Sequence, residues 1–578
     1  MNKKWFVHTK KADFDALSRR FGIDPVTARI IRNRDITEYD DIDRFLNGKL
    51  SDIESPYDLK YAEEAAFSLM DAIGDGIGIK VIGDYDVDGV CSSFIYLKTL
   101  TAVGAECSAD IPHRIRDGYG INEALIDKAA EEGYGVILTC DNGIAAYDQV
   151  QHAKDLGMYV IVTDHHEVPY TEDSAGNRNY RLPPADIVVD PKREDDSSSF
   201  KEICGAVVAL KVSEILMDAC GMSDNEKKTL MQSLMEAATL ATVCDVMPLV
   251  SDNRIIVKEG LKMINNTEST GLRALIDACS LSPGSITAYT LGFVLGPCIN
   301  ASGRLEAASE ALDLLITEDR ERAAGIAAHL RTLNDERKKL TEEGINKAIL
   351  TVDQQGMGSD MVLCIYIPGI HESVAGIIAG RVRERYSRPV FIFTDSDESD
   401  VIKGSGRSIE AYDMYGHITE FGELLTKFGG HKMAAGLSMK RENLSLFRKN
   451  MNDNSGLSEN DLVEKSYIDV ALPISYLSAG LIRELDSLEP FGTGNPRPVF
   501  GQKDVCVEFK RFIGKDDKMG KYVVKDDKGQ VGLTVFRDAP EFNGFLKEHN
   551  NKCTIFYTAQ VNEWNGREDV EIILKDYC

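Results

Sequence analysis

Between about residues 77 and 193, short apolar runs alternate with stretches of helical character. Runs such as "IGIKVIGDYD", "YGVILTCDNG" and "MYVIVTDHHE" are separated by segments such as "VCSSFIYLKTLTAVG" and "INEALIDKAAEEGYG". Strands that alternate with helices predict a parallel α/β sheet, buried on both faces. Ligands of such sheets bind at the carboxyl ends of the strands. The pattern therefore constrains both the fold class and the place of a site.

Polar side chains follow three of these predicted strands. Asp84, Asp86 and Asp88 follow one strand, Asp141 follows another, and Asp164-His165-His166 follows a third. The flanks "IGIKVI" and "VCSSFIYL" are apolar, so the aspartate triplet lies on a core rather than in a solvated turn. Clustered carboxylates at the edge of a core need a cation. The sequence therefore predicts a metal site.

The spacing of the triplet also resembles an EF-hand loop, but we exclude calcium. That loop needs a glutamate at position twelve and a helix before it. Here position twelve is Ile95, and a predicted strand precedes the loop. A mixed Asp/His shell suits Mn²⁺, whereas Mg²⁺ usually prefers oxygen ligands. Several carboxylates in one pocket can hold two ions about 3.5–4 Å apart, the arrangement used for phosphoryl hydrolysis.

The rest of the chain divides into further parts. Residues 200–315 look mostly helical, and "EDRERAAGIAAHLRTLNDERKKLTEEGINKAIL" predicts one long helix, either a bridge between domains or a plain surface helix. A second α/β stretch follows, in which "MVLCIYIPG" and "RPVFIFTD" flank the helix "HESVAGIIAGRVRERY". The tail from about residue 499 is strand-like with turn signals, which predicts a small β-barrel or sandwich.

Three glycine-bearing motifs are candidates for phosphate binding. They are "GGHKMAAG" with His431, "KGSGRS" with Arg407, and "GPCINASGR", which we expect to be a polar loop ending in Arg304. Glycines let a backbone approach a phosphate closely, but tight packing turns have the same composition. In the tail, Tyr522, Phe536, Tyr557 and Trp564 could stack on bases, although core packing is the commoner role of such residues.

Composition limits the alternatives. The 578 residues carry a formal net charge of −27, so any nucleic-acid role needs a local basic groove or a metal site. The twelve cysteines are scattered without a C-x-x-C pair, which fits reduced thiols rather than a disulfide frame. No long apolar run and no signal peptide are apparent, so we expect a cytoplasmic protein.

Together these motifs resemble the DHH/DHHA1 phosphoesterase family. "DHH", "GDYDVDG" and "GGHKMAAG" carry the resemblance. "LATVCDVMPL", "GPCINASGRL", "HESVAGIIAGR", "KGSGRS" and "LEPFGTGNPRPVF" narrow it to the single-stranded-DNA-specific exonucleases of that family. The eight motifs run in the family's order from about Leu59 to Phe500.

The resemblance implies an α/β fold with a parallel-sheet DHH domain, a long connecting helix, a smaller α/β DHHA1 domain and a C-terminal OB-like β-barrel. The expected parts are an N-terminal helical segment (1–58), the DHH domain (59–317), the connecting helix (318–350), the DHHA1 domain (351–455) and the OB-fold-like domain (456–578). An extra C-terminal domain of some members is expected to be absent.

The implied activity is Mn²⁺- or Mg²⁺-dependent 5′→3′ hydrolysis of single-stranded DNA to mononucleotides, in repair and recombination. A single-strand-binding protein and a RecQ-type helicase are candidate partners. By motif matching, the residues implied for two metal ions are Asp84, Asp86, Asp88, Asp141, His165 and Asp245. Those implied for the DNA phosphates are Asn300, Arg304, Ser405, Arg407 and His431, with catalytic roles for His166, Arg407 and His431.

Two positions depart from the family, and two rivals remain. Asp190 stands where members usually carry Asn, and Cys298 stands where many have Arg, which removes one phosphate contact. One rival is a DHH phosphodiesterase for short oligoribonucleotides or cyclic dinucleotides; such chains usually lack the strand-rich tail. The other rival is a scaffold with a dead site, which the retained aspartates oppose.

Overall fold

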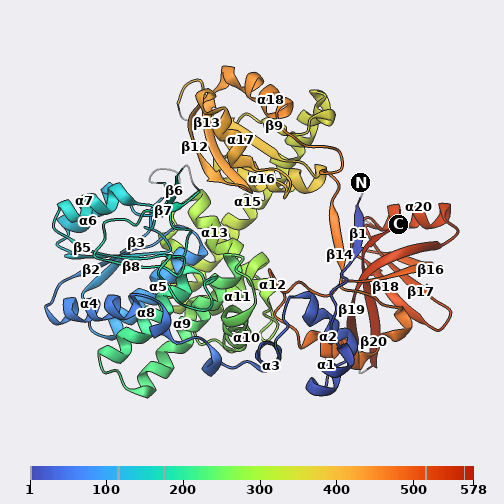
Figure 1. The fold of residues 1–578 in the computed structure, drawn as a ribbon, viewed down its shortest axis with the longest axis horizontal. Coiled ribbons are helices and arrows are strands. Elements are labelled where there is room, and N and C mark those ends of the chain that lie inside the picture. The colour runs from blue at the N-terminus through green and yellow to red at the C-terminus, as the bar shows by residue number, and fades with distance from the viewer. Residues whose placement is uncertain (1–2, 114–117, 174–175, 397, 515–516, 565–566) are drawn as a thin grey trace.

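The predicted parallel sheet is the centre of the first domain. Figure 1 shows a computed structural model of the chain, described for residues 3–113, 118–173, 176–396, 398–514, 517–564 and 567–578. Five parallel strands lie in the order β3-β2-β4-β5-β8. Their bounds are β2 (Ile79–Ile82), β3 (Cys107–Asp110), β4 (Val136–Cys140), β5 (Tyr159–Thr163) and β8 (Ile187–Val189).

Helices cover both faces of this sheet, because alternate strand residues point to opposite sides. Val81 and Leu138 join one apolar core with α4 (Ala62–Gly74), α5 (Val87–Ala102), α8 (Gly205–Ala219) and α9 (Asp224–Cys244). Ile82 and Ile137 join a second core with α6 (Glu123–Glu131) and α7 (Tyr147–Asp155). The hairpin of β6 (Tyr170–Glu172) and β7 (Arg178–Tyr180) lies outside the sheet.

The helical region beyond the sheet contains a helix, α13 (Gly296–Leu305), where the sequence suggests a loop. The elements are α10 (Ser251–Ile264), α11 (Thr270–Ala278), α12 (Ala288–Thr290), a π-helical turn at Leu291–Leu295, α13 (Gly296–Leu305) and α14 (Ser309–Ile316). The expectation of a loop at "GPCINASGR" was wrong. Its glycines serve close packing instead of a turn: a Cβ on Gly303 would lie 2.4 Å from the backbone oxygen of Tyr85.

The long predicted helix is α15 (Arg320–Gln354), and it bridges two domains. Its 35 residues span about 50 Å at 1.5 Å per residue. Leu330 and Leu333 belong to the core of the first domain, whereas Ala348 and Val352 belong to a core of the second. The surface-helix alternative is therefore excluded (Figure 1).

The second domain is a smaller α/β unit. Its mixed sheet has the order β12-β13-β11-β10-β9. The strands are β9 (Leu363–Tyr366), β10 (Val390–Asp395), β11 (Val401–Arg407), β12 (Leu425–His431) and β13 (Ala434–Lys440). Helix α16 (Glu372–Tyr386) packs on one face, and α17 (Met414–Glu420) and α18 (Leu444–Asp453) pack on the other.

The C-terminal part is a closed barrel, as the tail pattern and the resemblance predicted. The strands β15 (Val470–Ala471), β16 (Phe500–Ile513), β17 (Met519–Lys525), β18 (Gln530–Val535), β20 (Arg567–Tyr577) and β19 (Lys552–Trp564) pair in that order, and β16 also pairs with β19. Helix α20 (Ala539–Glu548) connects β18 to β19, and α19 (Ala479–Asp486) packs on the barrel.

The N-terminal residues pack on this barrel. Strand β1 (Lys4–Val7) pairs in parallel with β14 (Lys465–Ile468), and the Trp5 ring stacks on Phe556 at 4.2 Å. Helices α1 (Phe14–Phe21), α2 (Pro25–Asn33) and α3 (Tyr39–Asn47) share one apolar core with the barrel strands. The two ends of the chain therefore lie close together (Figure 1).

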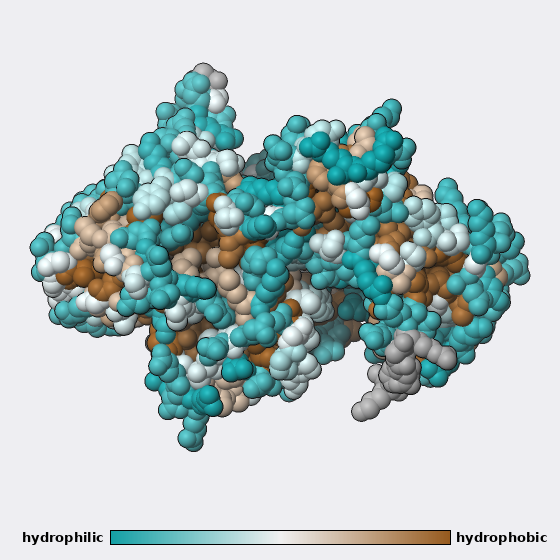
Figure 2. Space-filling view, turned by 90° about the horizontal axis from the view of Figure 1, so that it is seen from below, coloured by the Kyte–Doolittle hydropathy of each residue, from teal (hydrophilic) through white to brown (hydrophobic). Residues whose placement is uncertain are grey.

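Hydrophilic residues dominate the face of the molecule drawn in Figure 2, and hydrophobic residues occupy patches between them. Among the described residues, no helix combines the length and the hydropathy that crossing a membrane requires. All twelve cysteines belong to the described part of the chain and are free thiols, as predicted.

Candidate metal centre

The aspartate triplet lies in the tight loop between β2 and α5. The Asp86 side chain caps α5: its carboxylate accepts from the backbone N–H groups of Asp88 at 3.0 Å and Gly89 at 3.2 Å. A Cβ on Gly89 would lie 2.3 Å from the backbone oxygen of Asp84, so only glycine permits this fold of the loop. The backbone conformation of this loop therefore keeps the three carboxylates close together.

Backbone donors from elsewhere orient two of these carboxylates. Asp88 accepts from the N–H groups of Gly205 at 2.7 Å and Ala206 at 2.8 Å, at the N-terminus of α8. Asp84 accepts from Gly120 N–H at 3.1 Å. Both carboxylates are buried, so the fold holds them in place before any ligand binds.

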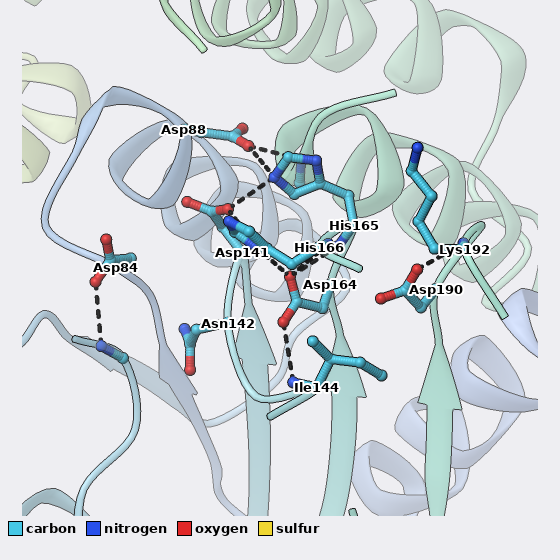
Figure 3. Close-up of polar contacts among 12 residues, drawn as sticks. Asp84, Asp88, Asp141, Asn142, Ile144, Asp164, His165, His166, Asp190 and Lys192 are labelled. Atoms are coloured by element: carbon cyan, nitrogen blue, oxygen red, sulfur yellow. Dashed lines mark hydrogen bonds and ion pairs between the residues drawn. The ribbon is translucent and has the colours of Figure 1, made fainter. Parts of the chain in front are cut away.

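His165 lies close to aspartates from three distant parts of the chain, and Figure 3 shows its contacts with two of them, Asp88 and Asp141. Its Nε2 lies 3.1 Å from the carboxylate of Asp141, which follows β4, and 3.4 Å from that of Asp88. Asp245, which caps the C-terminus of α9, lies 3.7 Å away. Asp141 adopts a left-handed backbone conformation with φ 60°, which turns its side chain into the cluster.

The cluster offers two separate sets of three ligand atoms. Asp84, Asp86 and Asp141 form one set, and Asp88, His165 and Asp245 form the other, with the ligand atoms of each set within 4.8 Å of one another. Asp141 and His165 also form a set with His166. The structure thus brings all six sequence-predicted metal residues together, in a number and mixture of oxygen and nitrogen donors that fit two divalent cations.

The electrostatics of the cluster favour a bound cation. Burial, and then the charges of Asp88 and Asp86, raise the pKa of Asp141 well above its usual range and that of Asp245 to about 8. Burial also lowers the pKa of His165, which leaves its imidazole neutral and able to donate an electron pair. A divalent ion would replace this mutual repulsion of the carboxylates with attraction.

Asp164 supports the cluster instead of entering it. Its carboxylate accepts from the Nδ1 of His166 at 2.7 Å and from Ile144 N–H at 2.9 Å. Burial lowers the pKa of His166, but the hydrogen bond to Asp164 and the negative charges of Asp164, Asp245 and Asp88 together outweigh it and raise that pKa to about 9. This supporting role was missed, although the position of Asp164 at the head of the DHH motif was a signal for it.

Two further residues were missed. Asn142 is fully buried and connects the ends of β2 and β4. Its Nδ2 donates to the backbone oxygens of Ile82 and Cys140, at 3.0 and 2.9 Å. Tyr119 donates to the backbone oxygen of Asp141 at 3.0 Å, and its hydroxyl lies 3.3 Å from the ring nitrogens of His166. The "CDNG" motif contains Asn142, but no sequence pattern distinguishes Tyr119.

Asp190 lies at the end of β8, outside the ligand sets. One of its carboxylate oxygens accepts from Lys192 N–H at 2.7 Å, and the other is buried without a hydrogen-bond partner in the protein. Burial, and then the charge of Asp164, raise its pKa well above the usual range. It lies beside the centre in Figure 3 without facing His165.

Asn300 and Arg304 extend the site along α13. The Asn300 Oδ1 accepts from Val87 N–H at 3.2 Å, which places it at the start of α5 beside the aspartate loop. The Arg304 guanidinium donates to the backbone oxygen of Ser373 at 2.9 Å, on α16 of the second domain. Helix α13 therefore connects the metal cluster to the second domain.

The remaining predicted residues belong to the second domain, not to the metal cluster. Ser405 and Arg407 lie on β11, and His431 ends β12. Ser405 and Lys403 line a cavity of about 430 Å³ on this sheet, together with Gly429 and Gly436. A Cβ on either glycine would meet nothing within 4 Å, so a ligand can approach the backbone there. By contrast, Gly404 and Gly406 of "KGSGRS" serve packing, since each lies against a phenylalanine ring.

Comparisons with known proteins agree with this architecture. Family models match for the DHH family N-terminal domain over residues 78–242, the DHHA1 domain over 359–454 and the RecJ OB domain over 468–576. The single-stranded-DNA-specific exonuclease RecJ of Bacillus subtilis is 31% identical over 576 residues, 99% of this chain and 70% of that protein. The RecJ of Escherichia coli is 30% identical and matches over 95% of both chains.

Comparison with solved structures also finds similarity to RecJ exonucleases. The crystal structure of RecJ in complex with Mn²⁺ from Thermus thermophilus superposes with a TM-score of 0.81 at 27% identity, over 100% of this chain and 80% of that one. A crystal structure of exonuclease RecJ bound to manganese matches with a TM-score of 0.59 at 31% identity, over 70% of this chain and 96% of that one. From its three domains and its full-length similarity, this chain belongs to the RecJ family of DHH/DHHA1 phosphoesterases.

Proposed function

We propose that this protein is a metal-dependent exonuclease that hydrolyses single-stranded DNA from its 5′ end to mononucleotides, in DNA repair and recombination. The observation that carries the proposal is the pair of ligand sets formed by residues from four distant segments. Relatives that align along nearly the whole chain are named as single-stranded-DNA-specific exonucleases. The barrel opposes the rival reading of an enzyme for short oligoribonucleotides or cyclic dinucleotides.

The proposed cofactors are two Mn²⁺ or Mg²⁺ ions. Asp84, Asp86 and Asp141 would hold one ion, and Asp88, His165 and Asp245 would hold the other. When bound, such ions supply Lewis acidity to an attacking water and to the phosphate oxygens. Mn²⁺ suits the histidine nitrogen better than Mg²⁺ does. Two RecJ structures in complex with Mn²⁺ and Mg²⁺ are consistent with either ion.

The protein's own groups would position the strand and move the proton. His166 is held by Asp164 through Nδ1, with its side chain 46% exposed, so its ring can exchange a proton with water or substrate. Arg407, Ser405 and His431 would bind phosphates from the second domain, and Asn300 and Arg304 from α13. Their donors would neutralise charge that develops on the phosphoryl oxygens.

A cavity of about 2110 Å³ beside the barrel is the proposed path of the strand. Lys503, Arg537 and Lys575 contribute cations to its lining, which also contains the carboxylates of Asp538, Glu541 and Asp576. Phe536 and Tyr289 contribute exposed aromatic rings. Cations that follow a backbone and rings that stack on bases are the two requirements for binding a single strand without sequence preference. Tyr522 and Tyr557, by contrast, are buried in the barrel core. The side chain of Trp564 is outside the described residues.

We further propose the division into domains at 1–58, 59–317, 318–350, 351–455 and 456–578. The three family matches support the DHH, DHHA1 and OB parts, whereas the segment 1–58 shares the apolar core of the barrel. A single-strand-binding protein and a RecQ-type helicase are the protein partners proposed by family resemblance. The reduced cysteines fit a cytoplasmic protein.

The test is a digest of a long 5′-phosphorylated oligonucleotide labelled at one end or the other. With Mn²⁺ or Mg²⁺, a 5′ label should appear at once as mononucleotide, whereas a 3′ label should remain on shortening strands. Blunt duplex and dinucleotides serve as comparison substrates, and chelator should stop the reaction. Faster turnover of dinucleotides than of the long strand would favour the rival phosphodiesterase.

A further inference from the structure

Two cysteines outside the metal centre lie close enough to react with each other. Cys279 caps the C-terminus of α11, and Cys298 lies in the first turn of α13. Their sulfur atoms are 3.6 Å apart. A disulfide needs about 2.05 Å, so the sulfurs must approach by only ~1.5 Å. Cys298 is fully buried and Cys279 is partly exposed, so a small oxidant in solvent reaches Cys279 first.

The surroundings make the two thiols unequal. The hydrogen bond from Cys298 lowers the pKa of Cys279 to about 7; burial opposes this effect, and the guanidinium of Arg331 on α15 adds to it. The pKa of Cys298 is raised by the same hydrogen bond and by burial. Asn334 Nδ2 donates to the Cys298 sulfur at 3.3 Å. A partly exposed thiol with a lowered pKa beside a buried thiol with a raised pKa is the arrangement of a reactive and a resolving cysteine.

One cysteine of the pair, Cys298, belongs to α13, the helix that connects the metal cluster to the second domain. Two residues beyond Cys298, Asn300 contacts the first turn of α5, and Arg304 contacts Ser373 one turn further on. The π-helical turn at Leu291–Leu295 directly precedes α13. Pulling Cys298 toward α11 would therefore shift the residues of α13 that face the site.

We propose that Cys279 and Cys298 form a redox-responsive dithiol, which hydrogen peroxide converts into a disulfide that slows the nuclease. The Cys279 thiolate attacks a peroxide oxygen; the O–O bond breaks, hydroxide leaves and takes up a proton, and a sulfenic acid forms. The Cys298 sulfur then attacks the sulfenic sulfur, loses its proton and expels water. The two sulfurs are oxidised by two electrons in all, and the peroxide is reduced to two waters. A dithiol reductant reverses the bond.

The covalent step can be tested without any nuclease assay. Both cysteines lie in one tryptic peptide, residues 274–304, because no Lys or Arg occurs between Arg273 and Arg304. After treatment with hydrogen peroxide and alkylation, this peptide should be lighter by two hydrogen atoms and carry no alkyl group. Chymotryptic cleavage at Tyr289 should leave its halves joined until dithiothreitol is added. Alkylation of both thiols in fully oxidant-treated protein would overturn the proposal.

The effect on activity rests on the proposed function and is measured separately. Peroxide should slow the wild-type protein about tenfold, the size of effect seen when supporting residues are displaced, and dithiothreitol should restore it. Cys279→Ser should be as active as reduced wild type and insensitive to peroxide. Cys220→Ser, which removes an exposed cysteine elsewhere, should respond like wild type.

Each remaining outcome is decisive. A disulfide with unchanged activity would overturn the regulatory part. Peroxide inactivation that persists in Cys279→Ser would assign the sensitivity to another group. If Cys279→Ser folds poorly, Arg331→Gln provides the second test: loss of the neighbouring charge should slow disulfide formation, and an unchanged rate would contradict the role of Arg331.

Discussion

At the scale of single residues, the site depends on Asp141 and His165, which connect the two ligand sets. Their 3.1 Å contact joins the end of β4 to the end of β5. Both side chains are buried, so neither can exchange its partners for water. Removing either one should affect both proposed ions at once, which distinguishes them from Asp84 or Asp245.

Asp141→Ala should reduce kcat by about 10³-fold or more, because ions at such sites contribute several kcal/mol to the transition state. The metal-free protein should remain folded, since the substitution removes a buried carboxylate that its neighbours repel. Thermal unfolding with and without Mn²⁺ provides the second measurement: the metal-induced rise in Tm should shrink or vanish. Asp155→Ala, at an exposed position on α7, is the matched control. Normal turnover by folded Asp141→Ala would contradict the metal assignment.

Asp164→Ala should reduce kcat by about 10- to 100-fold, the usual cost of losing a group that orients functional side chains. The substitution removes the acceptor for His166 Nδ1 and for Ile144 N–H while leaving the six metal residues in place. Asp164→Asn, which keeps one oxygen acceptor, should recover part of the rate. An equal loss in both variants would point to a requirement for the negative charge itself.

At the scale of elements, the first domain, the N-terminal helices and the barrel meet at one buried arginine. Arg254, on α10, donates to the backbone oxygens of Phe45 at 2.8 Å and Leu488 at 2.7 Å. Its guanidinium also lies over the Phe45 ring, 3.9 Å from the centroid. Three parts of the chain that are far apart in sequence therefore share one side chain.

Arg254→Ala should lower the free energy of unfolding by about 2–4 kcal/mol, because it leaves two buried carbonyls without donors and opens a cavity. The first denaturant transition is the appropriate measurement, since a chain of several domains need not unfold in one step. Lys262→Ala replaces an exposed cation on the same helix and should change stability by less than about 0.5 kcal/mol. Equal stability of the two variants would show that the interface does not depend on Arg254.

The same scale explains which parts of the molecule were predictable. The strands before Asp84, Asp141 and Asp164 were predictable because buried parallel strands are short apolar runs rich in β-branched residues. The carboxyl ends of such strands all lie at one edge of the sheet, which predicts where the site is. Helix α13 was not predictable, because glycines used for close packing have the same composition as glycines in a loop. The packing of the N-terminus on the barrel also could not be predicted from the sequence, because contacts such as the hydrogen bond from Trp5 to Asp576 join residues 571 positions apart. Local pattern carries no information about such a pairing.

At the scale of the whole molecule, a net charge of −27 must coexist with a polyanionic substrate. Part of that negative charge belongs to the metal cluster, where bound cations would offset it. The cavity beside the barrel has Lys503, Arg537 and Lys575 in its lining. Because salt screens distant charges beyond about 10 Å at 0.1 M, local cations decide binding there more than the total charge does.

Replacing Lys503, Arg537 and Lys575 together with alanine should weaken the binding of a long single strand by about tenfold or more. The slope of log K against log salt concentration should fall by about 2, because each lost phosphate contact removes roughly 0.7. All three residues are exposed, so the fold should survive. Deleting the barrel would be a poorer test, because its core is shared with the N-terminal helices. Cleavage of strands too short to reach the barrel should continue at the wild-type kcat, because the metal cluster is untouched. Lys528→Ala, an exposed cation of the barrel outside the cavity lining, should leave affinity and slope unchanged. An unaltered salt slope in the triple variant would mean that the strand takes another path to the metal centre.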